Sequence, residues 1–600
     1  MNNSPSIENK IKSVLNHGEI LLIIPPFGSI HDIAFGPHIL QSLAQSYGYK
    51  TDILYLNILL ASVIGTETYD CIYYSPEKQV LSERIFARIA YGLPSLGFNK
   101  NYSDLPQNGN GFETSSSPIP MEKLLEIETI CKSFINEVIS IITSSRYKII
   151  GSTCSMLRQT NCSIALLSGI KKQKPEVITI LGGSNCKGEM ADGIASLNKG
   201  IDYIFQGESE TSFLHFLKNY SENKLPQKRI IPGEPYNLNE IPFVDYDIFF
   251  KQYRHFLGET GTAKASIWYE TSRGCWYAEK SKCNFCSEYH VTYRQKSSET
   301  VLRDLERFSE SFPGQIILMT DLVMPGSYLK EVFPIIAEKK SKENFPFLGY
   351  QVRVPLSLEE LVLMKKAKVK AVLPGIETFS TSLLKLMNKG ITGSESLLFL
   401  RDAACAGIYV DWILLWGFPG DRVSDYEEVL KLLPLIRHLQ PPRTLSPMTL
   451  MQFSPYFRNP EANQISHIHP WDVLRSIYPP YADIEKLAVY FSGEFPCDSH
   501  RHPEIIKKLS HEVDIWKNTW KQSSLFMREF MGIYAIYDSR GIHEKEKTHI
   551  IDASQAKEIL SVTEITNPDE LSDNLKWALE EKLGVIMDSR YIPLITYSIE

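Results

Sequence analysis

The sequence lacks the long apolar run that a membrane-spanning helix requires. Its first apolar stretch, ILLII at residues 20–24, ends at Pro25 and Pro26, whereas a membrane span needs about 20 residues. The polar opening MNNSPSIENKIKSVLNHGE does not have the apolar core of an export signal. We therefore expect no membrane partner and a location in the cytoplasm.

The sequence also lacks an excess of positive charge. Its formal net charge is -7 with a pI of about 6.1, and its runs of Lys and Arg are short and scattered. Proteins that bind nucleic-acid polymers usually present a basic patch, because phosphate contacts dominate their affinity. We therefore expect no nucleic-acid partner.

Cysteines are few, and most of them follow no regular spacing. The 600 residues contain ten, of which only Cys275, Cys283 and Cys286 form a close cluster. This usage does not indicate a disulfide framework, which agrees with a reducing compartment. The hydrophobic content of 43% is ordinary for a soluble protein of several domains.

The first third of the sequence alternates short apolar segments with helical patterns. This alternation predicts an α/β fold with a doubly wound, Rossmann-like parallel sheet that helices cover on both faces. We assign this domain to residues 1–226, with a helical insertion near 57–145 that contains the polar loop SDLPQNGNGFETSSSP. The expected strands are at residues 20–24, 52–56, 149–152, 177–181 and 203–205.

A Pro- and Asn-rich linker is expected at residues 227–260, and a second alternation of strands and helices follows it. The six strands expected within residues 261–460 predict a partial (β/α)6 barrel. Residues 461–520 are predicted to be a helical connector, and 521–600 a small α+β winged-helix-like module. The barrel strands are expected at residues 266–271, 316–320, 348–354, 371–374, 410–416 and 449–453.

The clustered cysteines have the spacing C-x7-C-x2-C within ETSRGCWYAEKSKCNFCSEYH. One interpretation is structural zinc with His290 as the fourth ligand, because C-x2-C is a common half of a zinc site. The other is a [4Fe–4S] cluster, in which three thiolates leave one iron open. The spacing alone leaves both open. Cys275 directly follows the first barrel strand, and this position favours the cluster because such strand ends carry the chemistry of βα barrels.

The stretch SRGCWYAEKSKCNFC resembles the cluster loop of radical SAM enzymes, including the aromatic Phe285 before the last cysteine. The usual spacing of that superfamily is C-x3-C-x2-C. The longer spacing here, with RGCW, resembles the cobalamin-dependent radical SAM C-methyltransferases of ribosomal-peptide maturation. Other segments resemble the same branch, in its order, over roughly residues 18–480: LSERIFARIAYG, GSTCSMLRQTNCSIALL, ILGGSNCKGEM, IDYIFQGESE, PGIETFSTSLLKLMNKG, WGFPGD and QPPRTLSPMTLMQFSPYF.

The resemblance implies that Cys275, Cys283 and Cys286 hold a [4Fe–4S] cluster whose open iron binds S-adenosyl-L-methionine. An external one-electron reductant of the flavodoxin or ferredoxin type then triggers release of a 5′-deoxyadenosyl radical, which abstracts a hydrogen from the substrate. Methylcobalamin supplies a methyl group to the resulting carbon radical. The implied reaction is C-methylation of a ribosomally synthesised precursor peptide.

Polar residues at later strand ends are candidates for cofactor binding. Glu377 in PGIETF is the first candidate for a polar contact to S-adenosyl-L-methionine, and Gln351 and Arg353 in YQVRV come next. Asp321 and the turn Gly417–Gly420 are expected to face the same barrel mouth. In the alternative interpretation, each of these residues is satisfied by a neighbouring backbone amide.

The doubly wound domain is the candidate cobalamin site, because ligands bind such sheets where the strand order reverses. The S-x-L pattern in the loop STCSMLRQ and the glycine pair in ILGGSN resemble two of the three elements of a cobalamin-binding signature. The candidate contacts are Thr153, Ser155, Gln159, Gly182 and Gly183.

The third element of that signature, a D-x-H-x-x-G loop whose His binds cobalt from below, is not intact. The stretch SIHDIA has His31 in the matching place but lacks both the Asp and the Gly. The branch generally manages without a lower protein ligand. His31 is therefore either a lower ligand or an ordinary solvent-facing or capping residue.

Alternatives to peptide methylation remain open. The same cofactors also support epimerisation, cyclisation or methylation of a small molecule. A methylthiotransferase is disfavoured, because no second cysteine triad is present for an auxiliary cluster. A zinc-containing, non-catalytic peptide-binding adaptor is the alternative from another class. The last eighty residues either capture a leader peptide by strand addition or cap the open side of the barrel.

Overall fold

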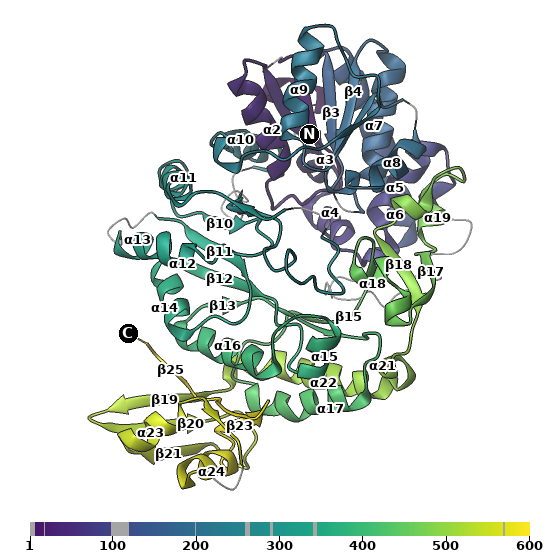
Figure 1. Ribbon diagram of the computed structural model, residues 1–600. Coiled ribbons are helices and arrows are strands. Elements are labelled where there is room, and N and C mark those ends of the chain that lie inside the picture. Colours follow the sequence, from purple (N-terminus) through teal and green to yellow (C-terminus); the bar gives the residue numbers. More distant parts are fainter. Residues whose placement is uncertain are drawn as a thin grey trace. The chain divides into compact units, whose positions relative to one another are not determined.

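The computed structural model describes residues 6–16, 18–97, 119–155, 157–198, 200–258, 265–288, 292–339, 345–567 and 571–599. The chain divides into two compact units (Figure 1). The first comprises Met1–Trp268 and His469–Ser492, and the second comprises Tyr269–Ile468 and Gly493–Glu600. Among the helices described, none is long and apolar enough to cross a lipid bilayer.

The first unit is built on a parallel sheet in the order β2-β1-β3-β4-β5-β6. All residues of β1 and β2 are buried, as expected for strands that are covered on both faces. The order reverses between β1 and β3, so the sheet is doubly wound, as the sequence predicts. The strands are β1 (Ile20–Ile24), β2 (Thr51–Tyr55), β3 (Ile149–Thr153), β4 (Ile178–Gly182), β5 (Tyr203–Gln206) and β6 (Ile230–Pro232).

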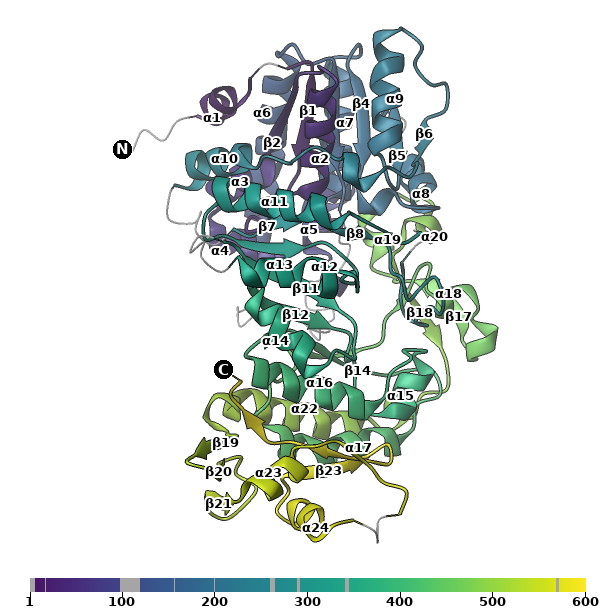
Figure 2. The same cartoon turned by 60° about the vertical axis from the view of Figure 1, so that its left-hand side comes forward.

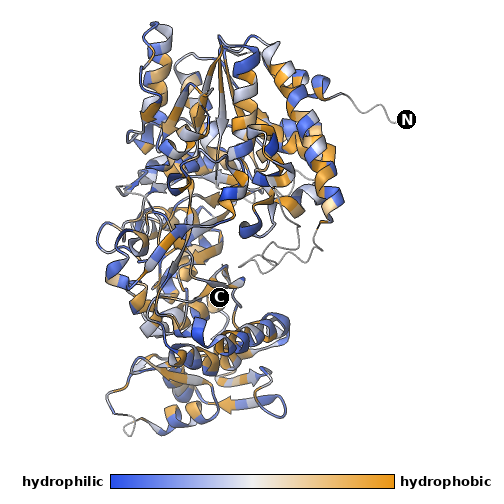
Figure 3. Cartoon of the chain, turned by 90° about the vertical axis from the view of Figure 1, so that its right-hand side faces the viewer, coloured by the Kyte–Doolittle hydropathy of each residue, from blue (hydrophilic) through white to orange (hydrophobic). Residues whose placement is uncertain are grey.

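Helices of mixed hydropathy surround this sheet (Figure 3). The predicted helical insertion between β2 and β3 consists of α3 (Leu56–Ile64), α4 (Thr66–Tyr73), α5 (Leu81–Tyr91) and α6 (Met121–Thr143), and its predicted loop at 103–118 lies outside the described residues. The other helices are α1 (Ile7–Val14), α2 (Phe35–Ser46), α7 (Thr160–Gln173), α8 (Met190–Leu197), α9 (Glu210–Ser221), α10 (Asp247–Leu257), α19 (Leu474–Ile477) and α20 (Ile484–Leu487).

The structure differs from the linker predicted at residues 227–260. This segment contains the edge strand β6 and helix α10. The buried Gln252 of α10 donates a hydrogen bond to the carbonyl of Ile53 at 2.7 Å and accepts one from the N–H of Tyr55 at 2.9 Å. The side-chain amide thus satisfies peptide groups of β2, the strand at the other edge of the sheet. Residue composition alone does not reveal such a long-range contact.

The second unit contains a five-stranded sheet in the order β13-β12-β11-β10-β7 and a parallel pair β14–β15. A parallel bridge between Glu377 and Leu414 links the segment after β12 to β14. The last predicted barrel strand is displaced, because β15 lies before residues 449–453, where only the short β16 (Leu450–Met451) forms. The strands are β7 (Ile267–Tyr269), β10 (Ile316–Met319), β11 (Phe347–Val352), β12 (Val369–Pro374), β13 (Tyr409–Val410), β14 (Ile413–Trp416) and β15 (Thr444–Pro447).

Helices alternate with these strands, as in the predicted partial barrel. A short antiparallel pair, β8 (Ser272–Arg273) and β9 (Arg294–Gln295), brackets the cysteine loop. The helices are α11 (Ser298–Ser311), α12 (Tyr328–Glu331), α13 (Phe333–Glu338), α14 (Leu358–Lys366), α15 (Thr381–Leu386), α16 (Gly393–Ala406), α17 (Val423–Leu432) and α18 (Pro455–Arg458).

Residues 461–520 are not the purely helical connector that the sequence predicts. They contain the strands β17 (Ser466–Pro470) and β18 (Tyr490–Glu494) before the helices α21 (Asp498–Arg501) and α22 (Pro503–Thr519). Prolines at 470, 479 and 480 exclude a long helix before α21.

The C-terminal residues form two small sheets with two helices (Figure 2). The first sheet has the order β21-β20-β19-β25, and the second has the order β22-β24-β23. The elements are β19 (Leu525–Phe530), β20 (Ile533–Asp538), β21 (Lys547–Ile551), α23 (Ala553–Ile559), β22 (Thr563–Glu564), α24 (Asp573–Glu580), β23 (Gly584–Met587), β24 (Arg590–Pro593) and β25 (Thr596–Tyr597).

Candidate functional site

The three cysteines lie on the loop that leaves the barrel sheet after β7. At the start of this loop, the carboxylate of Asp321 accepts hydrogen bonds from the N–H groups of Thr271 at 2.7 Å and Ser272 at 3.0 Å, and from the Thr271 hydroxyl. Burial raises the pKa of Asp321 to about 6, and these hydrogen bonds oppose the rise. Asp321 is fully buried, so it fixes the base of the loop and does not face the barrel mouth as predicted.

The segment between α15 and α16 holds the middle of the cysteine loop. The hydroxyl of Tyr277 donates a hydrogen bond to the carbonyl of Asn388 at 3.1 Å. The Asn388 side chain donates back to Ser281 Oγ and to the carbonyl of Lys282, both at 2.9 Å. The residues between the first two cysteines are therefore fastened to a second part of the barrel.

The end of the loop is fastened to the same segment. The N–H of Asn284 donates to the carbonyl of Met387 at 2.9 Å, and its side-chain amide donates to the carbonyl of Leu386 at 2.8 Å. Tyr456 joins both sides, because its N–H donates to Asn284 and its hydroxyl donates to Leu386, each at 2.9 Å. The last two cysteines thus extend from a well-anchored turn.

Cations lie beside the thiol of Cys283. Burial raises the pKa of this thiol, while the charges of Lys389 and Arg353 and a hydrogen bond with Arg353 lower it. Burial likewise raises the pKa of the neighbouring Cys286, and a hydrogen bond from the backbone of Glu288 opposes the rise. The two cations favour the thiolate of Cys283, which is the form that binds metal.

Glu377 forms an ion pair with Lys389 beside this thiol. The Oε1 and Nζ atoms are 2.5 Å apart, and the side chains are 16% and 8% exposed. Burial lowers the pKa of Lys389, but the negative charges of Glu377 and Cys283 raise it by more. A Cβ at Gly375 would lie 2.4 Å from Lys389 Nζ, so a larger residue there would displace the end of the Lys389 side chain from its present place.

Aromatic rings complete the surroundings of the cations. The guanidinium carbon of Arg353 lies 3.4 Å from the ring centroid of Tyr277, and Arg353 donates a hydrogen bond to the carbonyl of Lys389. Lys389 Nζ lies 5.5 Å from the ring centroid of Phe285. The structure therefore brings Phe285, Arg353 and Glu377 together with Cys283. Lys389 is the residue that the sequence analysis missed, although it stands in the motif LMNKG.

Gln351 lies at the end of β11, where its carbonyl accepts a hydrogen bond from the N–H of Met324 at 2.8 Å. Its side chain is half-buried and makes no hydrogen bond with any of the residues that the structure describes. This amide is therefore available to a ligand, and its predicted role in cofactor binding stays a prediction.

The turn Gly417–Gly420 is satisfied by neighbouring parts of the second unit. The N–H of Gly417 donates to the hydroxyl of Tyr426 at 2.9 Å, and the N–H of Gly420 donates to the carbonyl of Pro496 at 2.7 Å. These contacts agree with the alternative interpretation of this turn, in which its polar groups serve the fold.

Across the described ranges, no three His, Cys, Asp or Glu side chains gather closely enough to hold a single metal ion. The zinc interpretation depends on His290, which lies outside the described residues. A [4Fe–4S] cluster does not require convergence on one ion, because each thiolate binds a different iron. Three thiols on one anchored loop, one of them beside two cations, fit such a cluster.

In the first unit, the loops after β1 and β3 lie at the point where the strand order reverses. The buried side chain of Gln159 bridges them. Its Nε2 donates to the carbonyl of Pro25 at 2.8 Å, and its Oε1 accepts from the N–H of Ser155 at 3.0 Å. A Cβ at Gly28 would lie 2.7 Å from this Nε2. Both polar atoms of the Gln159 side chain, a predicted cofactor contact, are therefore hydrogen-bonded to the backbone of the protein.

The glycine pair at the end of β4 contains one position that the fold requires. Gly183 has a φ of +120°, and a Cβ on it would lie 2.5 Å from the carbonyl oxygen of Cys154. Cys154 in turn donates its N–H to the carbonyl of Gly182 at 2.7 Å. A Cβ on Gly182 would meet only Phe205, at 3.7 Å. Of the two positions, only Gly183 is reserved for glycine by the backbone.

A carboxylate from the helical insertion covers the N-terminus of α7. The fully buried Glu83 of α5 accepts hydrogen bonds from the N–H groups of Thr160 at 2.8 Å and Asn161 at 2.7 Å. Burial raises the pKa of Glu83 to about 7, and these hydrogen bonds oppose the rise. A carboxyl group of the chain itself therefore already occupies the helix end that often binds ligands in such sheets. Glu83 lies in the motif LSERIFARIAYG, where its spacing does not distinguish it from the other polar residues of the helix.

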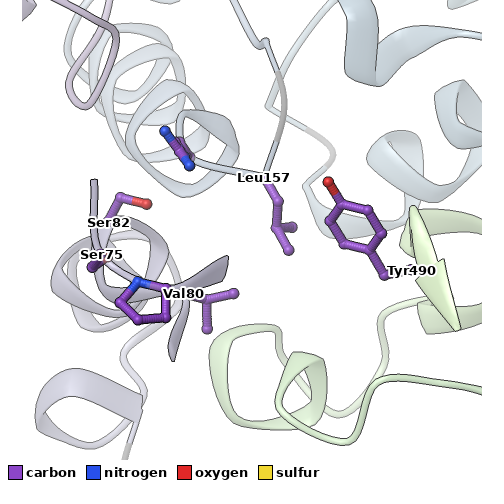
Figure 4. A pocket seen from close by; sticks show the side chains of 7 residues that line it. Ser75, Val80, Ser82, Leu157 and Tyr490 are labelled. Atoms are coloured by element: carbon purple, nitrogen blue, oxygen red, sulfur yellow. The ribbon is translucent and has the colours of Figure 1, made fainter. Parts of the chain in front are cut away.

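Two candidate contacts remain accessible at this edge of the sheet. Ser155 is exposed and Thr153, the last residue of β3, is half-buried. Beyond it, Leu157 lines a small pocket with Val80 and Tyr490 (Figure 4). The polar side chains of Thr153 and Ser155 and the apolar side chain of Leu157 thus lie close together in sequence at the end of β3.

His31 is engaged with a neighbour in the first unit. Its Nε2 lies 2.9 Å from Oδ2 of Asp70, and the two side chains are 36% and 29% exposed. The N–H of His31 donates to Ser29 Oγ at 3.1 Å. The structure thus gives His31 a local role in its loop, and a role as a cobalt ligand stays a prediction.

Comparison with known proteins supports the assignment of the second unit. The model of the radical SAM superfamily matches residues 269–433. The chain is 25% identical to the tRNA-2-methylthio-N(6)-dimethylallyladenosine synthase of Endomicrobium trichonymphae over 174 residues. The aligned region is 28% of this chain and 41% of that protein. The chain therefore matches less than half the length of this curated relative.

Two solved structures share the fold over most of the chain. One is OxsB, a cobalamin-dependent S-adenosylmethionine radical enzyme with aqua-cobalamin and S-adenosylmethionine bound, at a TM-score of 0.55 and 14% identity over 85% of this chain and 68% of that chain. The other is the radical S-adenosylmethionine methyltransferase TsrM from Kitasatospora setae, at 0.54 and 12% identity over 83% of this chain and 89% of that chain. Residues 269–433 therefore match a radical SAM domain, and the fold of the chain is that of OxsB and TsrM.

Proposed function

We propose that this protein is a cobalamin-dependent radical SAM C-methyltransferase that modifies a carbon of a ribosomally synthesised precursor peptide. The observation that carries the proposal is the loop of Cys275, Cys283 and Cys286, anchored within a radical SAM domain beside Arg353 and Lys389. Three thiolates and two adjacent cations fit a cluster whose net charge must be balanced in a half-buried site.

When bound, a [4Fe–4S] cluster and S-adenosyl-L-methionine supply a radical that abstracts hydrogen from carbon, and cobalamin supplies the methyl group. The residues of this chain bind and orient these groups. Arg353 and Lys389 lie where they stabilise negative charge near Cys283, and Glu377 holds Lys389 in place. Glu377 and Gln351 are the proposed polar contacts to S-adenosyl-L-methionine.

The strand ends of the first unit are the proposed cobalamin site. Support comes from the doubly wound topology, in which ligands bind where the strand order reverses, and from the fold shared with OxsB. Ser155 and Thr153 are the side chains that remain accessible there. Gln159 and Gly183 contribute by shaping the loops, and Gly182 leaves its backbone open to a ligand.

The peptide substrate is proposed from the C-x7-C-x2-C spacing and the motifs that resemble enzymes of ribosomal-peptide maturation. The C-terminal module supports it in a second way. We propose that this module is winged-helix-like, with the element order α23–β22–α24–β23–β24 and the sheet order β22-β24-β23 as support. An external flavodoxin- or ferredoxin-type reductant and a cytoplasmic location belong to the same proposal.

The test is a reaction of the full chain, with its cluster reconstituted without oxygen, with S-adenosyl-L-methionine, methylcobalamin, a reductant and the precursor peptide encoded beside the gene. The proposal expects a methylated peptide together with 5′-deoxyadenosine and S-adenosylhomocysteine. Deoxyadenosine without methyl transfer would favour another radical reaction of the same cofactors. Zinc in place of iron and sulfide would favour the peptide-binding adaptor.

A further inference from the structure

Trp276 directly follows the first cysteine of the cluster loop, and its indole N–H is left without an acceptor. The Nε1 atom is buried and has no hydrogen-bond partner among the residues that the structure describes. Two other buried tryptophans of the second unit differ. Trp412 donates to the carbonyl of Gln440 at 3.0 Å, and Trp516 donates to that of Leu439 at 2.8 Å. Since indole nitrogen only donates and a buried donor without an acceptor is destabilising, we expect its acceptor to be a group that binds here.

The chain on both sides of Trp276 is fixed. Before it, the Arg273 side chain donates to both carboxylate oxygens of Glu270, at 2.9 and 2.7 Å. After it, the Tyr277 hydroxyl is hydrogen-bonded to the connection between α15 and α16. The rings of Trp276 and Tyr277 form a T-shaped contact with their centroids 6.4 Å apart. The indole N–H therefore has a defined place within the cysteine loop.

Carboxylates that flank the loop already have partners of their own. Glu270 pairs with Arg273 at 2.7 Å, and Glu377 pairs with Lys389 at 2.5 Å. A carboxylate would otherwise be a strong acceptor for a buried N–H group. The acceptor for the indole is therefore sought in the group that the loop binds.

Sulfur atoms are the acceptors that such a group supplies. Trp276 follows Cys275, and consecutive Cα atoms are about 3.8 Å apart, so the two side chains start from neighbouring points of the loop. When bound, a [4Fe–4S] cluster brings thiolate and sulfide sulfurs to this place, and both accept hydrogen bonds.

We propose that the indole N–H of Trp276 donates a hydrogen bond to a sulfur of the [4Fe–4S] cluster and thereby raises the potential at which the cluster is reduced. The inference rests on the proposed function, since this cluster is the one that the three cysteines are proposed to hold. Reduction adds one electron from the external flavodoxin- or ferredoxin-type donor, and the sulfurs become more negative. A fixed N–H donor therefore stabilises the reduced form more than the oxidised form.

The test is a redox titration of the full chain, with its cluster reconstituted and without cobalamin or peptide, followed by electron paramagnetic resonance. The variant Trp276→Phe keeps an aromatic ring but lacks the N–H. At the midpoint potential of the parent protein, its ratio of reduced to oxidised cluster should fall roughly tenfold, which is about 59 mV for one electron. The matched control Trp471→Phe changes a half-buried tryptophan of the first unit and should leave the potential unchanged.

A second probe detects the hydrogen bond itself and separates it from packing. Protein grown with tryptophan that carries nitrogen-15 in its indole ring should show a nitrogen-15 coupling in pulsed spectra of the reduced cluster. The coupling should be lost in Trp276→Phe and kept in Trp471→Phe. Benzothienylalanine at position 276 keeps the shape of the indole without its N–H, and it should lower the potential as Phe does.

Three results would overturn the assignment. One is an unchanged potential in Trp276→Phe. Another is a coupling that appears only with S-adenosyl-L-methionine, which would give the N–H to that cofactor. The third is a shift in Trp276→Phe that benzothienylalanine does not reproduce, which would make the effect one of packing.

These readouts need neither peptide nor methyl transfer. If the peptide is not methylated while Trp276→Phe still lowers the potential, the role of Trp276 stands and the proposed reaction does not. If methylation proceeds and the potential is unchanged, the reverse holds. A chain that takes up zinc in place of iron and sulfide would overturn both.

Discussion

The two units end their parallel strands in different ways. At the strand ends of the second unit, Arg353, Glu377 and Lys389 gather around a half-buried thiol and leave a site with strong local charge. At the strand ends of the first unit, the side chains of Gln159 and Glu83 are already hydrogen-bonded to backbone groups of the same unit. One edge is prepared for a charged, reactive group, and the other is a rigid, largely neutral rim.

This difference fits the chemistry proposed for each unit. A cluster held by thiolates needs nearby cations, because its ligands bind as anions. A large corrin cofactor needs shape and backbone access more than charge, and a rim whose polar side chains are already paired does not rearrange on binding. Substitutions at each edge distinguish whether the two edges are specialised in this way.

The largest effect is expected for Cys283→Ala in the second unit. Loss of a cluster ligand should end S-adenosyl-L-methionine cleavage, a greater loss than the roughly 10- to 100-fold caused by removing an outer partner of a metal site. Iron, sulfide and 5′-deoxyadenosine yields measure it. Cys71→Ala changes a half-buried thiol of α4 and should alter none of them. An equal loss in both variants would remove the distinction between the two edges.

Glu377→Gln should be the next largest change. It leaves the nearly buried Lys389 without its partner, at a cost of about 3 kcal/mol in unfolding free energy. Because Lys389 also lies by Cys283, the affinity for S-adenosyl-L-methionine should fall as well. Urea unfolding and equilibrium binding of the cofactor measure the two effects. The control is Glu427→Gln, an exposed residue of α17 without an ion pair among the described residues.

Glu83→Gln should change how the stability of the first unit depends on pH. The pKa of Glu83 is about 7 in the folded protein against an ordinary 4.5, so the folded state binds the proton more strongly. Its contribution to stability is thus present below pH 4.5 and is lost as the pH rises to about 7. The parent protein should lose about 3 kcal/mol over this window relative to the variant.

Urea unfolding of both proteins across that window measures the difference. Glu137→Gln, on the exposed side of α6, should run parallel to the parent protein. A constant gap between the parent protein and Glu83→Gln at all pH values would mean that Glu83 is already ionised at low pH, and that this rim is more polar than the comparison holds.

Gly183→Ala and Gly182→Ala form a matched pair within one motif. The first places a Cβ 2.5 Å from the Cys154 carbonyl at a φ of +120°, and should cost about 2 kcal/mol. The second meets only Phe205 at 3.7 Å and should be nearly neutral in stability. Thermal unfolding compares the two. If Gly182→Ala weakens cobalamin binding without a change in stability, its backbone contacts the cofactor; equal destabilisation by both would contradict the packing described here.

The smallest effect is expected for His31→Ala. The hydrogen-bonded contact with Asp70 is about one-third exposed, so its loss should cost at most about 1 kcal/mol. The absorption spectrum of bound cobalamin should stay unchanged, because the resembled branch works without a lower protein ligand. A shifted spectrum would show that His31 binds cobalt, and the strand ends of the first unit would then also contain a residue that binds metal.

The sequence predicts features that rest on local pattern, and it misses those that depend on distant contacts. Apolar runs locate most strands of both sheets to within a few residues, but β6 lies in the predicted linker and β15 precedes the predicted site. Close spacing identifies the three cysteines. Glu83 looks like any polar residue of an amphipathic helix, because its partners lie 77 and 78 positions away. Lys389 and Asp321 owe their roles to burial, which spacing does not encode.

The hydrogen bonds that anchor the cysteine loop link the length of this loop to the connection between α15 and α16. The stretch between Cys275 and Cys283 reaches Asn388 through Tyr277, Ser281 and Lys282. A chain with only three residues between these cysteines has no residues left to make those bonds. The length of this loop and the sequence of the α15–α16 connection should therefore change together among relatives, and an engineer who shortens one must rebuild the other.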